Sequence, residues 1–171
     1  MDEVILVDSR DKEIGSMEKL AAHQQGVLHR AFSILIYNEQ GDMLIHQRAN
    51  GKYHSGGLWT NACCSHPKPG ESAEHAVRRR LMEEMGIDAQ PTFLYKFLYK
   101  ISLDNALIEH EYDHVYSFQG NVSPVANTEE VADWKYISIE ELTADIDENP
   151  DQYTFWFKMI MDSLHKKQLV L

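Results

Sequence analysis

Cysteine is scarce in this chain, and the two residues present are adjacent. Among 171 residues only Cys63 and Cys64 carry thiols. Neighbouring residues on an extended segment point to opposite faces, so a bond between these two would need strained geometry. Neither thiol has another partner in the sequence. We therefore expect both cysteines to be free.

Long hydrophobic runs are also missing. The first residues are acidic and include only four consecutive apolar residues, Val4–Val7, which excludes an ordinary signal peptide or membrane span there. No internal repeat, linker or low-complexity tract interrupts the chain. Its 43% hydrophobic content is sufficient for one packed core. We expect a single domain over residues 1–171, in a cytoplasmic protein.

Positive charge is outnumbered, with 16 Lys and Arg against 27 Asp and Glu and a formal net charge of −11. Nucleic acid and anionic membranes repel such a chain at long range, so we expect it to bind neither. Residues 48–80 nevertheless form a basic island of six cations and two carboxylates. An island of this size suits a compact anion such as a diphosphate. We expect Arg78 and Arg79 to contribute only to a solvated helix face.

Residues 56–86 contain the most informative pattern. A short strand is predicted over 58–62, followed by a loop that carries Cys64 and His66. Prolines and a glycine then break the chain before a helix over about 72–85. The pattern places reactive side chains in the loop and a helix beside them.

Glu84 occupies an unusual position on the predicted helix. It lies near the middle of the apolar arc that Val77, Leu81 and Met85 define. A buried carboxylate needs a cation, because burial without one is costly. Arg80, one turn earlier, would supply that cation as an ordinary ion pair, and a metal ion would supply it equally well. The sequence leaves both possibilities open.

The remaining segments alternate between predicted strands and helices. Strands are predicted over 4–7, from about 13, over 32–37, 43–47, 92–103, 107–118 and 134–137, and helices over 139–145 and 152–166. The order predicts an α/β (α+β) sandwich with helices packed on a mixed sheet. On the strand over 107–118, alternation places Glu109, Glu111 and Asp113 on one face.

Potential metal ligands occur in three separated segments: His23, His29, His66, Glu109 and Glu111. Three imidazoles and two carboxylates suit zinc or a divalent transition metal, with magnesium less natural at so much nitrogen. A histidine taken alone is more often a surface or core residue than a ligand. The prediction therefore depends on the fold bringing these segments together.

The stretch over about 65–87 resembles the Nudix box, a loop–helix signature that binds metal and diphosphate. The residues that match its spacing are Glu71, Arg79, Glu83, Glu84 and Gly86. Ser65 stands where the box opens with glycine, and Arg80 stands where the hydrolases have a metal-binding glutamate. A cation at that position should weaken a hydrolytic magnesium cluster and favour a bound phosphate. The resemblance implies a Nudix-type α/β/α sandwich with different chemistry.

A second resemblance covers residues 3–162, nearly the whole chain. It is carried by Asn61-Ala-Cys-Cys-Ser-His-Pro67, the pairs Ala22-His23 and Leu28-His29, Glu109-His-Glu111 and Trp156. These motifs resemble type I isopentenyl-diphosphate Δ-isomerase, a Nudix-fold enzyme. That family interconverts isopentenyl and dimethylallyl diphosphate by protonating the alkene and removing a proton from the neighbouring carbon, through a tertiary carbocation.

This resemblance implies a role for each matched residue. The catalytic set would be Cys64, Glu111, Tyr99 and Trp156, with the tryptophan ring facing the carbocation. One divalent ion, manganese, zinc or magnesium, would be held by His23, His29, His66, Glu109 and Glu111. A magnesium ion arriving with the diphosphate would be held by Glu84 and the main-chain carbonyl of Cys64. The diphosphate itself would be bound by Lys19, Arg48, Lys52 and Arg80.

These residues are compatible with three functions. The isomerase explains the thiol, the Glu-x-Glu strand, the histidines and Arg80, and we prefer it. A Nudix hydrolase of another diphosphate explains the box but leaves Cys64, His66 and Trp156 without a role. A metal-stabilised binding module without turnover is the third, because an intact motif set is necessary for catalysis and not sufficient. We expect a monomer or weak dimer.

Overall fold

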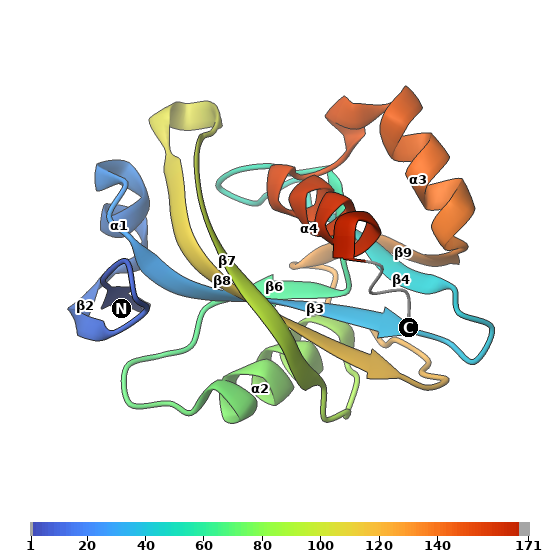
Figure 1. The fold of residues 1–171 in the computed structure, drawn as a ribbon, viewed down its shortest axis with the longest axis horizontal. Helices are drawn as coiled ribbons and strands as arrows, with labels where there is room; N and C mark the ends of the chain where they lie inside the picture. The colour runs from blue at the N-terminus through green and yellow to red at the C-terminus, as the bar shows by residue number, and fades with distance from the viewer. Residues whose placement is uncertain (1, 168–171) are drawn as a thin grey trace.

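A mixed nine-stranded sheet lies at the centre of the computed structural model, which describes residues 2–167 (Figure 1). The strands are β1 (Glu3–Val7), β2 (Glu13–Glu18), β3 (His29–Tyr37), β4 (Met43–Arg48), β5 (Trp59–Asn61), β6 (Cys63–Ser65), β7 (Thr92–Ser102), β8 (Ile108–Gln119) and β9 (Val131–Ile137). The helices are α1 (Lys19–Gln25), α2 (Ala73–Met85), α3 (Ile139–Glu148) and α4 (Phe155–Lys167), with 3₁₀ turns at Asp104–Ala106 and Pro150–Gln152. None of these described helices is long and apolar enough to span a membrane.

Strand β3 is the hub of the sheet. Along one edge it pairs in parallel with β8, from His29 opposite Glu111 to Tyr37 opposite Gln119. Along the other edge it pairs antiparallel with β1 near its start, β6 in its middle and β4 at its end. Because both edges and both faces are covered, every residue of β3 except Arg30 is buried.

Two hydrophobic cores pack on opposite faces of the sheet. Alternation along β3 sends Phe32, Ile34 and Ile36 into the core shared with α2. Leu35 and Tyr37 enter the other core, which is shared with α3 and α4. Figure 1 shows α2 on one side of the sheet and α3 and α4 on the other. The predicted α/β/α sandwich is therefore confirmed.

Helix α2 begins and ends where the sequence predicts. The Ser72 hydroxyl accepts a hydrogen bond from the main-chain N–H of His75 and caps the first turn. Gly86 ends the helix in the left-handed conformation, with φ 65°. A side chain there would place its Cβ 2.6 Å from the carbonyl oxygen of Val125. Glycine is required at this position for its backbone angle and for the close approach.

The ends of several other elements differ from the prediction. The strand predicted over 58–62 is reduced to Trp59–Asn61, and β9 starts at Val131 rather than at residue 134. Helix α4 begins at Phe155 rather than at residue 152, because Pro150–Gln152 forms a 3₁₀ turn. These shifts leave the order of the elements unchanged.

Two elements were missed. Helix α1 has only seven residues, too few for a periodic apolar pattern to be recognised. The segment around Cys64, predicted as a loop, is strand β6, because residues 63–65 fill the gap beside β3 between β1 and β4. Both cysteines are free, as expected.

Candidate active site

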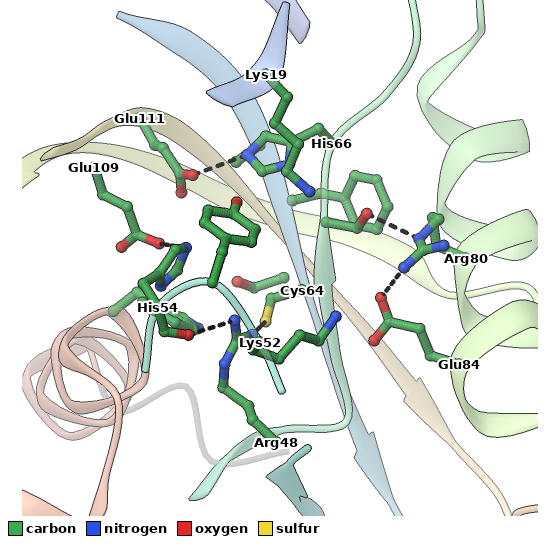
Figure 2. A pocket seen from close by; sticks show the side chains of 16 residues that line it. Lys19, Arg48, Lys52, His54, Cys64, His66, Arg80, Glu84, Glu109 and Glu111 are labelled. Atoms are coloured by element: carbon green, nitrogen blue, oxygen red, sulfur yellow. Dashed lines mark hydrogen bonds and ion pairs between the residues drawn. The ribbon is translucent and has the colours of Figure 1, made fainter. Parts of the chain in front are cut away.

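One pocket lies where α1, α2, β3, β6, β8 and α4 meet the loop between β4 and β5 (Figure 2). The predicted residues that line it are Lys19, Arg48, Lys52, Cys64, His66, Arg80, Glu84, Glu109, Glu111 and Trp156. His23, His29 and Tyr99 lie behind its wall, in contact with Glu111. The fold thus brings all of the predicted site residues together, and their roles stay predictions.

Strand β6 decides which thiol faces the pocket. Cys64 pairs with Ser33 in the register with β3, and its side chain lines the pocket. Cys63 points to the opposite face, where it is fully buried in the core beside α2. Side-chain alternation therefore admits only one of the two thiols, and in the structure that thiol is Cys64.

The Cys64 thiol lies beside a buried guanidinium and an indole ring. Burial raises the pKa of Cys64 to about 12, although the charge of Arg48 opposes the rise. Arg48 Nη1 lies 3.7 Å from the sulfur, and the guanidinium carbon lies 5.3 Å from the centre of the Trp156 ring. The thiol therefore holds its proton at neutral pH.

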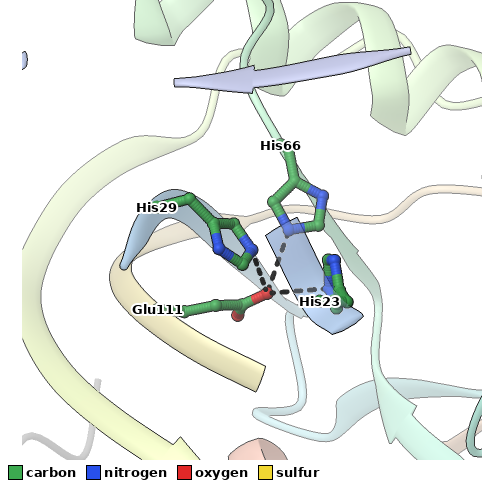
Figure 3. A group of neighbouring side chains, drawn as sticks. All are labelled: His23, His29, His66 and Glu111. Carbon is green, nitrogen blue, oxygen red and sulfur yellow. Dashed lines mark hydrogen bonds and ion pairs between the residues drawn. The ribbon is translucent and has the colours of Figure 1, made fainter. Parts of the chain in front are cut away.

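Three imidazoles converge on one carboxylate oxygen (Figure 3). From Glu111 Oε1, the Nε2 atoms of His66, His29 and His23 lie at 2.9, 3.4 and 3.9 Å. Their potential ligand atoms all lie within 4.8 Å of one another. Helix α1 supplies His23, the start of β3 supplies His29, and β8 supplies Glu111, so the cluster joins segments far apart in the sequence.

The tautomers of His23 and His29 suit a metal ion. Nδ1 of His23 lies 2.7 Å from the carbonyl oxygen of Lys19, and Nδ1 of His29 lies 2.8 Å from that of Val27. Because a carbonyl only accepts, each Nδ1 carries the proton and each Nε2 presents a lone pair. Both Nε2 atoms are buried without a hydrogen-bond partner among the described residues. Orphaned neutral nitrogens beside a carboxylate fit a divalent ion.

The two glutamates of β8 are joined by Tyr99. Its hydroxyl lies 2.7 Å from Glu111 Oε2 and 3.0 Å from Glu109 Oε2. Burial works against a charge on Glu111, but the hydrogen bond from Nε2 of His66 to Oε1 favours that charge, and the pKa of Glu111 is held well below its usual value. Burial, together with the charge of Glu111, raises the pKa of Glu109 well above its usual value. The negative charge of the pair is therefore concentrated on Glu111.

The neighbours of Glu109 differ from those that the sequence predicts. Its ligand oxygen does not join the group formed by the other four predicted ligands, and lies instead with His23 and His54. His54 Nε2 lies 3.4 Å from Glu109 Oε1. Burial, reinforced by the charge of Arg48, lowers the pKa of His54 to about 3, so this imidazole is neutral. His54 is not predicted from the sequence, because a lone histidine in a loop carries no spacing signal.

Figure 2 shows Arg80 on the other side of Cys64 from the two β8 glutamates, whereas Arg48 approaches the thiol from below. Lys19, Lys52 and Arg80 also border an adjoining cavity. Glu130, which the sequence analysis also missed, pairs with Lys52 and lies 3.5 Å from Arg80. Glu130 is far from these cations in sequence, and only the packing of β9 against β4 reveals it.

Of the two partners considered for Glu84, the structure contains the arginine. Glu84 is buried and forms an ion pair with Arg80, one turn earlier on α2. It belongs to no cluster of three or more metal-ligating side chains among the described residues. The second ion at Glu84 therefore stays a prediction.

The prediction that Arg78 and Arg79 lie on a solvated face of α2 is correct for Arg78 and wrong for Arg79. Arg78 is exposed and pairs with Asp88. Arg79 is largely buried and donates through Nε and Nη2 to both oxygens of Glu71, at 2.7 and 2.8 Å. These bonds lower the pKa of Glu71 to about 2. The fork ties the loop after β6 to helix α2.

Comparisons with known proteins identify the family of this chain. The NUDIX domain family matches residues 27–157. Isopentenyl-diphosphate Delta-isomerase of Serratia proteamaculans is 47% identical, with 99% of this chain and 95% of that protein covered. Isopentenyl-diphosphate Delta-isomerase 2 of Photorhabdus laumondii is 48% identical, over 96% and 93% of the two chains. The similarity extends over nearly the full length of both relatives.

Solved structures share the fold at lower sequence identity. DR0079 from Deinococcus radiodurans superposes with a TM-score of 0.72 at 19% identity, over 86% of this chain and 90% of that one. The MutT protein from Methanosarcina mazei gives a TM-score of 0.68 at 17% identity, over 82% and 95% of the two chains. At this identity the likeness concerns the arrangement of the sheet and helices alone.

Proposed function

This chain belongs to the isopentenyl-diphosphate Delta-isomerase family of the Nudix superfamily, and we propose that Cys64 and Glu111 perform its reaction. The enzyme interconverts isopentenyl and dimethylallyl diphosphate by adding a proton to the alkene and removing one from the neighbouring carbon. The observation that carries the proposal is the placement of the two groups. Cys64 and Glu111 face one pocket from strands that pair with opposite edges of β3.

The proton balance of the reaction fits these two groups. Protonation of the alkene gives a tertiary cation, and loss of a proton from the neighbouring carbon restores a double bond, so no net proton is consumed. The thiol of Cys64 holds a proton, and Glu111 holds a negative charge. One group of the pair gives a proton and the other takes one, and the reverse reaction exchanges the roles. Tyr99 donates to Glu111 Oε2 and fixes that carboxylate.

Binding of the diphosphate is assigned to four cations: Lys19, Arg48, Lys52 and Arg80. Lys19, Lys52 and Arg80 approach from α1, the loop after β4 and α2, and meet where the two cavities join. Arg48 lies deeper and donates to the main-chain carbonyls of His54 and Ser55. Its proposed contact with the diphosphate therefore rests on the resemblance alone. With the diphosphate bound by these cations, the alkene of the substrate would lie between Cys64 and the two glutamates, Glu109 and Glu111.

The metal centre is assigned to His23, His29, His66, Glu109 and Glu111. When a divalent ion is bound there, whether manganese, zinc or magnesium, its charge holds Glu111 in place and tunes the acidity of that carboxylate. A magnesium ion that accompanies the diphosphate is assigned to Glu84 and the main-chain carbonyl of Cys64. Both assignments follow the resemblance, and the orphaned Nε2 atoms of His23 and His29 support the first.

The setting of the enzyme completes the proposal. We propose one domain over residues 1–171 that works in the cytoplasm as a monomer or weak dimer. The formal net charge of −11 supports an enzyme that binds neither nucleic acid nor anionic membranes. Its substrate is a small isoprenyl diphosphate.

Trp156 is assigned to the cation, because a carbocation accepts no hydrogen bond and a π face is a neutral group that stabilises it. We expect Trp156→Leu to lower turnover about 10- to 100-fold, while the affinity for dimethylallyl diphosphate changes much less, since the cation exists only along the reaction path. Steady-state kinetics and product binding measure the two effects. Trp134→Leu is the control, because Trp134 lies on β9 outside the pocket. Equal losses of turnover and affinity in Trp156→Leu would show a packing role.

The test of the function is incubation of the metal-loaded protein with isopentenyl diphosphate in heavy water, followed by NMR. We expect dimethylallyl diphosphate that carries deuterium from the solvent. Release of inorganic phosphate or isopentenyl monophosphate would show a Nudix hydrolase instead, active despite Arg80 at the position of the hydrolase glutamate. Unchanged substrate would show the binding module without turnover.

A further inference from the structure

We propose that His54 is a positioning residue of the metal centre, which holds Glu109 in the orientation needed to bind a divalent ion. The inference rests on the proposed function, because that function defines the centre. His54 lies in the loop between β4 and β5, two residues after Lys52. It is outside the ligand set predicted from the sequence, and it is only 4% exposed.

His54 contacts two members of the centre at once. Its Nε2 lies 3.4 Å from Glu109 Oε1 (Figure 2). Its ring stacks on that of His23, with ring centres 5.8 Å apart and planes 27° from parallel. Potential ligand atoms of His23, His54 and Glu109 all lie within 4.8 Å of one another. The imidazole of His54 is therefore packed directly against two of the residues assigned to the metal centre, His23 and Glu109.

Hydrogen bonds to main-chain carbonyls hold the loop that carries His54. Arg48, itself buried, donates to the carbonyl oxygens of His54 and Ser55, both at 3.2 Å. Asn105 donates to the carbonyl oxygen of Tyr53 at 3.1 Å. Ser55 adopts φ 51°, a conformation that residues other than glycine rarely occupy. Three consecutive residues are thus fixed, and His54 is directed toward Glu109 in advance.

The hydrogen bonds of His54 indicate which ring nitrogen carries the proton. Its Nδ1 lies 3.2 Å from Ser55 Oγ. When the serine hydroxyl donates to Nδ1, the single proton of the neutral ring stands on Nε2 and faces Glu109. Tyr99 contacts the other oxygen of Glu109, so both carboxylate oxygens have a fixed neighbour. Because Tyr99 also contacts Glu111, the orientation of one glutamate constrains the other.

Metal affinity tests this role without requiring turnover. The metal-free full-length protein is titrated with Mn²⁺, and free Mn²⁺ is followed by electron paramagnetic resonance. We expect His54→Leu to weaken binding about 10- to 100-fold, the effect typical of a lost contact to a metal ligand. His54→Gln, whose amide nitrogen reaches the position of Nε2, should keep most of the affinity. His165→Leu, at an exposed site on α4, is the control.

A matched pair of variants, His54→Asn and His54→Gln, distinguishes a lost contact from misfolding of the protein. His54→Asn keeps the amide but is one carbon shorter than His54→Gln, so it should lose affinity as His54→Leu does. Thermal unfolding of each metal-free variant shows whether the fold is intact. The proposal is overturned if the wild type binds no Mn²⁺, if His54→Leu and His54→Asn bind it as tightly as the wild type, or if His54→Gln loses as much as they do. Loss of affinity in a protein that forms no deuterated product would support His54 and refute the isomerase assignment.

Discussion

Cys64→Ala is expected to lose isomerisation almost completely while the protein stays folded and binds its product. General acid–base groups contribute about 10²- to 10⁴-fold, so turnover should fall at least a hundredfold. The substitution removes one sulfur atom, whose polar neighbour is Arg48 at 3.7 Å. It leaves Lys19, Lys52 and Arg80 in place. Turnover is measured by NMR, and dimethylallyl diphosphate binding by calorimetry.

The neighbouring cysteine supplies the control. Cys63→Ala removes the same sulfur atom from the opposite face of β6, in the core beside α2. It should lower the free energy of unfolding, because it leaves a small cavity, and it should keep isomerisation. If Cys64→Ala turned over near the wild-type rate, the acid–base pair would be misassigned. If Cys63→Ala were the inactive variant, the register of β6 would be the error.

The sandwich and much of the site geometry follow from side-chain periodicity. The alternation of β8 predicts that Glu109, Glu111 and Asp113 share a face, and all three are buried there. The pattern of α2 predicts both its ends and the burial of Glu84. Such patterns are local, so a short window of sequence contains all the information that they need.

Local patterns fail where an element is short or where a partner is distant. Strand β6 has three residues and lacks an alternating apolar pattern, so its existence depends on the free edge of β3. His54 and Glu130 reach the site only because a loop and the packing of β9 beside β4 bring them there. Neither position has a periodic signal. Tertiary packing, rather than sequence spacing, places these residues.

The choice between an ion pair and a metal at Glu84 shows a different limit. Spacing on a helix permits Arg80 and Glu84 to pair, and the structure contains that pair. A diphosphate among the same cations would compete for Arg80 and change the electrostatic surroundings of Glu84. The ligand, which the sequence does not encode, therefore takes part in deciding the partner of this carboxylate.

Glu111→Gln separates this site from an ordinary buried ion pair, because it should remove two properties together. The amide has no negative charge for the three imidazoles around Oε1, so Mn²⁺ affinity should fall more than tenfold. It also cannot exchange a proton as a carboxylate does, so turnover should fall at least about a hundredfold. Cys64→Ala, in contrast, should lose turnover and keep Mn²⁺ affinity.

Asp113→Asn is the matched control for the substitution at Glu111, on the same face of the same strand. Asp113 is buried and accepts a hydrogen bond from Ser33 at 2.8 Å, but it does not line the pocket. We expect this variant to keep Mn²⁺ affinity, which would show that replacing a buried carboxyl group of β8 by an amide is not sufficient to lose the metal. If Glu111→Gln kept turnover and lost only metal, Glu111 would be a ligand and not an acid–base group. If it kept metal and lost only turnover, the centre would be held by the histidines and Glu109 without Glu111, and the dual role assigned to Glu111 would be wrong.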